Sequence, residues 1–162
     1  MIGMHPLLHR TFLVILIFSI IFTLGFIFSN STVSKTISAG QSSAIVEQIK
    51  PIVDPEDKIP ADTFQHYVRK SAHFAEYLLL GFEFFALLIL LRGNFSWKLP
   101  CALLFPLISA LVDETLQVFS ERGSGVIDVW LDFAGALAGY AACALVFLIF
   151  YTFSVKISKK RT

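Results

Sequence analysis

The sequence has little charge and few cysteines. Only 15% of its 162 residues are charged, the formal net charge is +1, and the two cysteines are Cys101 and Cys143. A nearly neutral chain has no electrostatic attraction to nucleic acid, so we expect no such partner. Both cysteines lie inside apolar runs, which favours packed thiols over a disulfide framework.

The patterns of several common enzyme classes are also missing. The chain has no glycine-rich phosphate loop, no serine, histidine and aspartate in the order of a hydrolase triad, and no cysteine in a reactive setting. It also has no soluble segment large enough to form a separate catalytic domain. Any chemistry must therefore come from polar side chains within an apolar protein.

Apolar residues dominate the sequence. They make up 56% of it, 17 residues are phenylalanine, and the mean hydropathy is +0.72. About 20 apolar residues cross a bilayer as a helix, and four segments approach or exceed this length, at about 11–29, 72–91, 99–119 and 127–153. We therefore predict an all-α fold: residues 1–162 form a single integral membrane domain, a bundle of four transmembrane helices joined by an outer loop at 30–71.

The cations predict the orientation of this bundle. Arg10, Arg92, Lys98 and the basic tail at 156–161 fall on one side if the chain crosses four times. The positive-inside rule makes that side cytoplasmic, so both termini are expected in the cytoplasm. Residues 30–71 and 120–126 are then outside.

The outer loop is expected to contain some local structure. Its Ser/Thr-rich part, 29–43, predicts a flexible link, and 44–53 predicts a short helix on the membrane surface. Asp62, followed by Gln65, is expected to cap a helix that starts near Thr63.

Polar residues interrupt three of the apolar segments close to their predicted outer ends. An ionised side chain at the bilayer centre costs about 2.5–3.5 kcal/mol on insertion scales, so such groups should face inward and share partners. Within each segment, the spacing of the polar residues places them on one helix face. Two interpretations remain open: a functional site, or a salt-bridged polar plug that fixes the helix register. The residues are Arg69, His73 and Glu76; Asp113, Glu114 and Gln117; and Asp128 and Asp132.

Two glycines support this convergence. Gly135 and Gly139 are spaced i, i+4 on the face of Asp128 and Asp132, a spacing that lets a neighbouring helix approach closely. Glu83, near mid-membrane, predicts a protonated acid bonded to a neighbouring helix. His5 and His9, in the N-terminal tail, are expected to be solvated only.

At these positions the sequence resembles a known family. The stretches "RKSAHFAEY" and "DETLQVFSERGSGVIDVWLDFAGALAG" resemble the K-x-x-H-F-x-E-Y, D-E-x-x-Q and R-x-x-x-x-x-D-x-x-x-[ND]-x-x-G elements of VanZ-like membrane proteins, and "FIFSNSTVS" is similar to that family as well. Asp132 stands where many relatives carry Asn. The resemblance implies a multi-pass protein of the bacterial cell membrane and an association with low-level resistance to teicoplanin-type glycopeptides. The matching positions are Lys70, His73, Glu76, Glu114, Gln117, Arg122, Asp128 and Gly135.

The first functional hypothesis is an activity at the outer face on a lipid-linked envelope component or a glycopeptide-type ligand. The candidate catalytic residues are His73, Glu76, Glu114 and Asp128. The candidate ligand-binding residues are Lys70, Asp113, Gln117, Arg122 and Asp132.

The sequence leaves two alternative functions open and weakly indicates one class of cofactor. The second hypothesis is a binding or partner protein without chemistry, whose polar cluster recognises a ligand or holds the structure together. Ion or proton movement is third, because the inner half of each span is almost wholly apolar. One imidazole and several carboxylates weakly indicate a divalent cation such as Mg, Mn or Zn.

Overall fold

The computed structural model describes residues 6–120 and 125–159, and this part of the chain is helical with no strand. The prediction of an all-α protein is confirmed. Five helices follow one another along the chain: α1 (Pro6–Thr32), α2 (Lys35–Val53), α3 (Ala61–Leu90), α4 (Phe95–Phe119) and α5 (Val126–Lys159).

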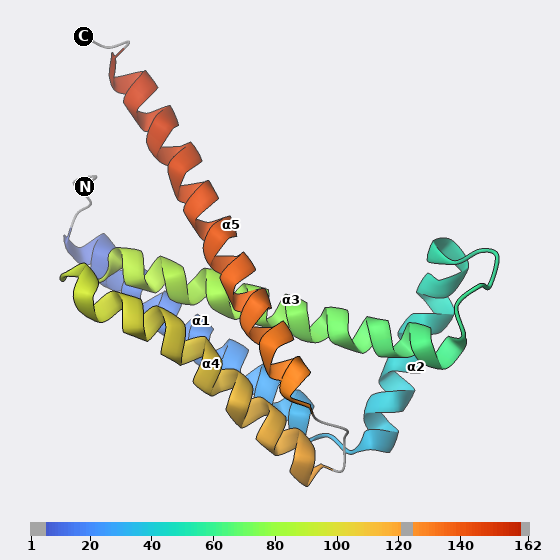
Figure 1. The fold of residues 1–162 in the computed structure, drawn as a ribbon. Coiled ribbons are helices and arrows are strands. Elements are labelled where there is room, and N and C mark those ends of the chain that lie inside the picture. Colours follow the sequence, from blue (N-terminus) through green and yellow to red (C-terminus); the bar gives the residue numbers. More distant parts are fainter. Residues whose placement is uncertain (1–5, 121–124, 160–162) are drawn as a thin grey trace.

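Four of these helices are long and apolar enough to cross a membrane, as the sequence predicts. They are α1, α3, α4 and α5, whereas α2 lies beside the others at one end of the molecule (Figure 1). At 1.5 Å per residue, the 30 residues of α3 span about 45 Å, which exceeds the hydrocarbon core of a bilayer. The first turns of α3 therefore extend beyond the hydrocarbon.

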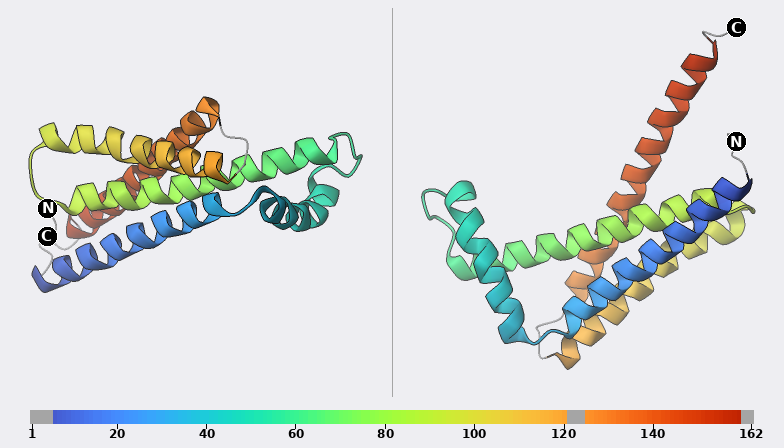
Figure 2. Two further views of the ribbon diagram at one scale, coloured as in Figure 1. Left: turned by 90° about the horizontal axis from the view of Figure 1, so that it is seen from below. Right: turned by 180° about the vertical axis from the view of Figure 1, so that it is seen from behind.

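The four long helices alternate in direction. α1 and α4 run side by side in the same direction, α3 runs against them, and α5 crosses α3 on its way back (Figures 1 and 2). The first turn of α1 and the last turn of α5 therefore lie toward the same end of the molecule, as an even number of crossings requires. Which end faces the cytoplasm stays a prediction from the positive-inside rule.

Glycines hold α5 against α3. A Cβ atom on Gly135 would lie 2.6 Å from the carbonyl oxygen of Phe74, and one on Gly139 would overlap the backbone of Leu78. The predicted close approach at these two glycines is confirmed. Gly81 on α3 makes the reciprocal contact, because a Cβ there would overlap the backbone of Ala136. The backbones of α3 and α5 thus touch at a point where side chains would separate them.

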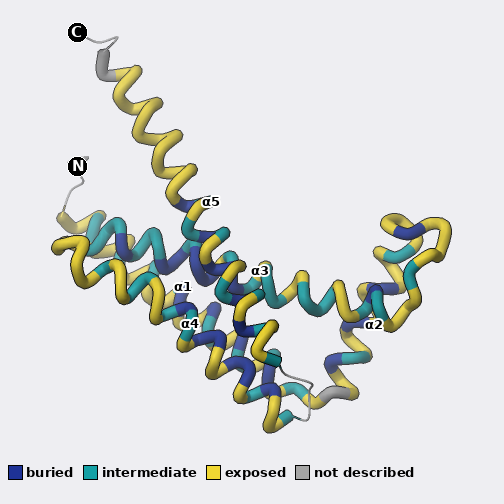
Figure 3. Tube along the Cα trace, viewed as in Figure 1, coloured by how far each residue is buried: buried dark blue, intermediate teal, exposed yellow. Residues whose placement is uncertain are grey.

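Burial is concentrated where α3 meets its neighbours (Figure 3). Tyr77 and Leu80 of α3, Ile27 of α1 and Ala110 of α4 have no exposed surface. The last turns of α5 extend away from the other helices, and their apolar side chains are exposed. In a bilayer such side chains contact lipid.

Three local expectations are wrong. Residues 29–43 form no flexible link, because α1 continues to Thr32 and α2 begins at Lys35. Asp62 is not the cap of α3: Pro60 holds that position, and Asp62 lies in the first turn, where its charge interacts favourably with the helix dipole. Gln65 instead donates to the carbonyl oxygen of Ala39 at 2.8 Å and ties α3 to α2.

The third concerns His9. Its Nε2 lies 3.1 Å from the carbonyl oxygen of Leu90, so this side chain joins the start of α1 to the end of α3 instead of being solvated only. Lys98 secures the same end of α3 by donating to the carbonyl oxygens of Leu88 and Leu91, at 2.6 Å each. His5 lies outside the described residues.

Candidate functional site

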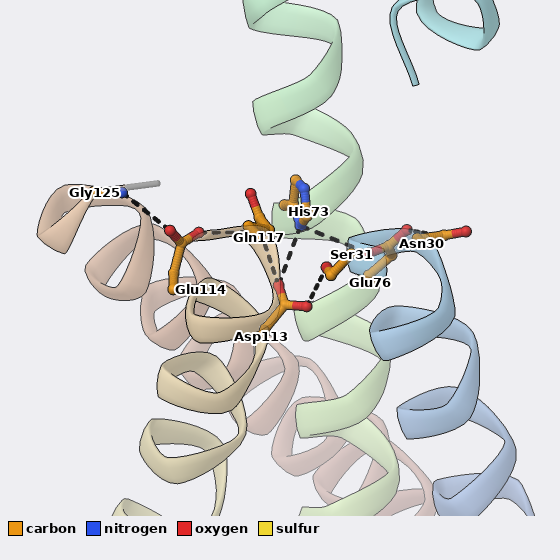
Figure 4. A network of polar contacts seen from close by, with 8 residues as sticks. All are labelled: Asn30, Ser31, His73, Glu76, Asp113, Glu114, Gln117 and Gly125. Carbon is orange, nitrogen blue, oxygen red and sulfur yellow. Dashed lines mark hydrogen bonds and ion pairs between the residues drawn. The ribbon is translucent and has the colours of Figure 1, made fainter. Parts of the chain in front are cut away.

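Polar side chains from α1, α3 and α4 meet at the end of the molecule where α1 and α4 finish and α5 begins (Figure 4), and polar side chains from the first turns of α5 lie beside them. We call this group the polar cluster. It contains Asn30 and Ser31 of α1, Lys70, His73 and Glu76 of α3, Asp113, Glu114 and Gln117 of α4, and Asp128 and Asp132 of α5.

Asp113 lies at the centre of the polar cluster. Its side chain has no exposed surface, and three helices supply its neighbours. Ser31 donates to Oδ1, Gln117 Nε2 donates to Oδ2 at 3.2 Å, and His73 Nδ1 lies 3.6 Å from Oδ2. The carboxylate therefore connects α1, α3 and α4 through a single side chain.

Glu114, the next residue on α4, reaches toward α5. Its Oε1 accepts a hydrogen bond from Gln117 at 3.1 Å, and its Oε2 accepts one from the backbone N–H of Gly125 at 3.0 Å. Gly125 immediately precedes α5, so this bond fixes the start of that helix. Gln117 thus donates to two neighbouring carboxylates at once.

Glu76 joins α3 to α1. Asn30 Nδ2 donates to its Oε1 at 2.9 Å, and His73 Nδ1 lies 3.8 Å from its Oε2. The imidazole of His73 therefore has a carboxylate on either side, Glu76 on its own helix and Asp113 on α4. This arrangement can orient the ring.

Lys70 and Asp128 form the mouth of the polar cluster. Lys70 Nζ lies 2.5 Å from Asp128 Oδ1, and the two side chains are 31% and 28% exposed. This pair joins α3 to the first turn of α5. Because it is partly solvated, either member can turn toward a ligand at modest cost.

Asp132 lies one turn deeper on α5 and differs from its neighbours. It is 1% exposed, and neither carboxylate oxygen has a hydrogen-bond partner among residues 6–120 and 125–159. One ligand atom from each of His73, Asp113 and Asp132 lies within 4.8 Å of the others. The same part of the chain offers no partner to the buried hydroxyl of Tyr77, one turn beyond His73 on α3.

Two hollows adjoin the His73–Glu76 pair. The first, about 40 Å³, is lined by charged and polar residues of α3, α4 and α5, including Lys70, His73 and Asp132. The second, about 360 Å³, lies between α1 and α3 and is mostly apolar, with Phe22, Phe26, Leu79, Ser19, Thr23, Glu76 and Glu83 in its wall. His73 lines the first hollow and Glu76 the second, so the pair separates them.

Most of the site residues predicted from sequence lie in this cluster. His73, Glu76, Asp113, Glu114 and Gln117 form the network of Figure 4, with Lys70, Asp128 and Asp132 beside it. Arg122 lies outside the described residues. The structure thus places these eight side chains, and the role of each stays a prediction.

Two members of the cluster are not predicted from the sequence, whereas the bonding of one residue outside the cluster is predicted correctly. Asn30 and Ser31 were assigned to a loop, because the apolar run ends at Ser29. They belong to the last turn of α1, and the "FIFSNSTVS" resemblance was the signal that could have found them. Glu83 bonds a neighbouring helix as predicted, since Ser19 of α1 donates to its Oε1 at 2.6 Å.

Comparison with known proteins adds one clear finding. Neither the curated proteins nor the solved structures gave a significant match to the chain. A model of the VanZ/LLP1 family, in contrast, matches residues 12–154, which include nearly all of the four long helices and the whole polar cluster. The chain is therefore a membrane protein with four helices able to span the bilayer, and it belongs to the VanZ/LLP1 family.

Proposed function

We propose that this protein acts at the outer face of the bacterial cell membrane on a lipid-linked component of the cell envelope. The polar head of that component occupies the polar cluster, and its apolar chain lies in the hollow between α1 and α3.

One observation carries this proposal: the polar hollow and the apolar hollow lie on either side of the His73–Glu76 pair, with His73 in the wall of the first and Glu76 in the wall of the second. A water-soluble ligand would need only the first hollow, and an ordinary membrane lipid only the second. A molecule with a charged head and a long apolar chain fits both. At this depth the surrounding medium is hydrocarbon, so such a chain enters the second hollow without leaving lipid.

The charges of the mouth suit an anionic head group. Lys70 is held by Asp128 at a partly exposed position, and a phosphate oxygen can replace that carboxylate as its partner. Arg69 lines the same hollow and adds a second cation. Arg122 is a third candidate for this role by its family resemblance. A phosphate or diphosphate ester is therefore the head group we favour.

Deeper residues have the chemistry for proton transfer. His73 lies within 4 Å of carboxylates on two helices, an arrangement that can orient the ring and set its tautomer. Glu114 is held in place by Gln117 and Gly125. These groups would take up or release the proton of a bound head group. A changed envelope would also explain the association of the family with glycopeptide susceptibility.

A second candidate function, recognition without chemistry, has its own support. Asp113 and Glu114 already accept hydrogen bonds from Ser31, Gln117 and Gly125, as structural carboxylates do. Ion or proton transport is less favoured, because the carboxylate of Glu83 is engaged by Ser19 and the remainder of α3 beyond it, residues 84–90, is apolar.

The test compares lipid and cell-wall-precursor pools in cells that lack the protein with those in cells that carry it. Complementation uses the parent, His73→Ala, Glu114→Gln and, as a control, Asp62→Asn at an exposed acid outside the cluster. We expect a lipid-linked phosphate species to change on deletion and to be restored by the parent and the control only. Unchanged pools with altered glycopeptide susceptibility would favour recognition, and no change in either measurement would refute the proposal.

A further inference from the structure

We infer that His73, Asp113 and Asp132 hold one divalent transition-metal ion between α3, α4 and α5. The inference deepens the proposed function: it rests on that function for the substrate, and on the geometry of these side chains for the ion.

The three side chains are close enough to share an ion. One ligand atom from each lies within 4.8 Å of the other two. Bonds from zinc to imidazole nitrogen or carboxylate oxygen are about 2.0–2.2 Å, so two ligands of a tetrahedral ion are about 3.4 Å apart. Shifts of up to about an ångström would bring all three into coordination.

Asp132 supplies an independent observation. It is 1% exposed, and no residue in the described part of the chain bonds either of its oxygens. The nearby ammonium group of Lys70 is engaged by Asp128 instead. A buried carboxylate without a partner loses several kcal/mol of solvation, and one cation would compensate both this group and neighbouring Asp113.

The surroundings match those of known metal ligands. Ligating carboxylates are usually fixed by further hydrogen bonds, and Asp113 accepts two, from Ser31 and Gln117. The small polar hollow beside His73 and Asp132 has room for a water molecule or a substrate oxygen on the open side of the ion. A ligand set of one imidazole and two carboxylates suits Zn²⁺ or Mn²⁺ better than Ca²⁺.

The ion would complete the site for an anionic head group. Lys70 lines the same hollow as His73 and Asp132. A phosphate oxygen could therefore bind the ion while a second oxygen of the same group faces the ammonium. Three helices would then be held together by a ligand set that only the folded protein provides.

The test measures metal content and thermal stability. Purified protein is stripped with a chelator, incubated with Zn²⁺, Mn²⁺ or Mg²⁺, and passed through a desalting column before elemental analysis. We expect close to one equivalent of Zn²⁺ or Mn²⁺ in the parent and at least a tenfold loss of affinity in Asp132→Asn. Glu83→Gln is the matched control, because it removes another buried acid, one whose Oε1 accepts a hydrogen bond from Ser19 and which is not among the three proposed ligands.

Melting distinguishes a lost ligand from a lost fold. The parent and Glu83→Gln should gain several degrees in Tm when the metal is added, whereas Asp132→Asn should fold and show no gain. Less than a tenth of an equivalent in the parent, or equal metal content in the parent and Asp132→Asn, would overturn the inference. If metal binds and the lipid pools do not change, only the proposed function fails; if the pools change without metal, only this inference fails.

Discussion

Charged side chains have different partners at the mouth of the polar cluster, Lys70 and Asp128, and at its floor, Asp113 and Asp132. At the mouth, Lys70 and Asp128 pair with each other and keep about a third of their surface exposed. At the floor, Asp113 and Asp132 are almost completely buried, and Asp132 has no hydrogen-bond partner in the described part of the chain. The chain thus balances its own charges at the mouth and leaves an imbalance at the floor.

This difference indicates which charged side chains contribute to folding stability and which are candidates for a functional role. An exposed ion pair contributes about 1 kcal/mol at most, and it can open to admit a ligand. Burying a carboxylate costs several kcal/mol unless a partner compensates it. A side chain placed like Asp132 does not stabilise the fold by itself, and the inferred cation would supply the partner that it lacks.

The largest expected effect concerns which side of the membrane the mouth faces. Ser43 on α2 and Ser96 on α4 are both exposed and lie toward opposite ends of the molecule. If the positive-inside rule holds, an impermeant thiol reagent applied to intact cells should label Ser43→Cys and leave Ser96→Cys unlabelled.

Opening the membrane is the control for this labelling. Ser96→Cys should then react as fully as Ser43→Cys. Both native thiols, Cys101 and Cys143, are replaced by serine beforehand. The reverse pattern in intact cells would place the polar cluster in the cytoplasm and remove the proposed substrate.

The next-largest effect is expected when the close contact between α3 and α5 is disrupted. Gly139→Leu would force α5 off the backbone of α3, and because the obstacle is backbone, the cost should exceed the about 1–3 kcal/mol that overpacking usually causes. We expect little folded protein by size-exclusion chromatography in detergent. Gly25→Leu is the control, because a Cβ there has no neighbour within 4 Å. Equal yields of both variants would mean that α5 packs elsewhere.

A smaller effect compares mouth and floor directly. Asp113→Ala removes the acceptor of Ser31 and one of the two acceptors of Gln117, and a buried donor left unsatisfied costs roughly 1–3 kcal/mol. Asp128→Ala breaks only a partly exposed pair and should cost about 1 kcal/mol or less. Thermal melts of both variants measure the difference. Similar losses would show that burial does not distinguish the two regions.

The sequence predicts the spans and most of the cluster for a physical reason. Because charge is costly in a bilayer, His73, Glu114 and Asp132 are expected to point toward the interior of the bundle. The spacing along each helix then places its polar residues on one face. The glycine spacing at 135 and 139 identifies the face of α5 that packs, because only backbone contact explains a stripe of small residues in an apolar helix.

The ends of the helices are harder to predict. Polar residues that continue a helix into the interface look like a loop, which is why Asn30 and Ser31 are missed although they bond Glu76 and Asp113. The floor of the site is equally hidden, since no spacing rule shows that Lys70 pairs with Asp128 and leaves Asp132 without a cation. The bonds of Asn30 and Ser31 and the pairing of Lys70 with Asp128 both depend on the level along the helices at which one helix crosses another.

The smallest effect is expected at a carboxylate outside the membrane whose partners all come from the protein. Asp54 ends α2, and it accepts hydrogen bonds from the backbone N–H groups of Ile59 at 2.8 Å and Lys58 at 3.0 Å, with Lys50 at 3.6 Å. These bonds, that of Ile59 first, lower the pKa of Asp54 below its usual 3.8. The folded turn therefore gains stability above that value and loses it as the pH falls through the lowered pKa.

Hydrogen exchange at the backbone amides of Lys58 and Ile59, corrected for intrinsic rates, measures this loss. We expect protection in the parent to fall as the pH drops below about 4, the ordinary carboxyl pKa, and to be lost once the pH has passed the lowered pKa of Asp54. Asp54→Asn should show weaker protection without the pH step, because an amide accepts one hydrogen bond but carries no charge. Glu56→Gln, at an exposed acid paired with Lys58, should keep the step. A step that survives in Asp54→Asn would assign the titration to another acid, and Asp54 would no longer serve as the satisfied reference for the floor of the polar cluster.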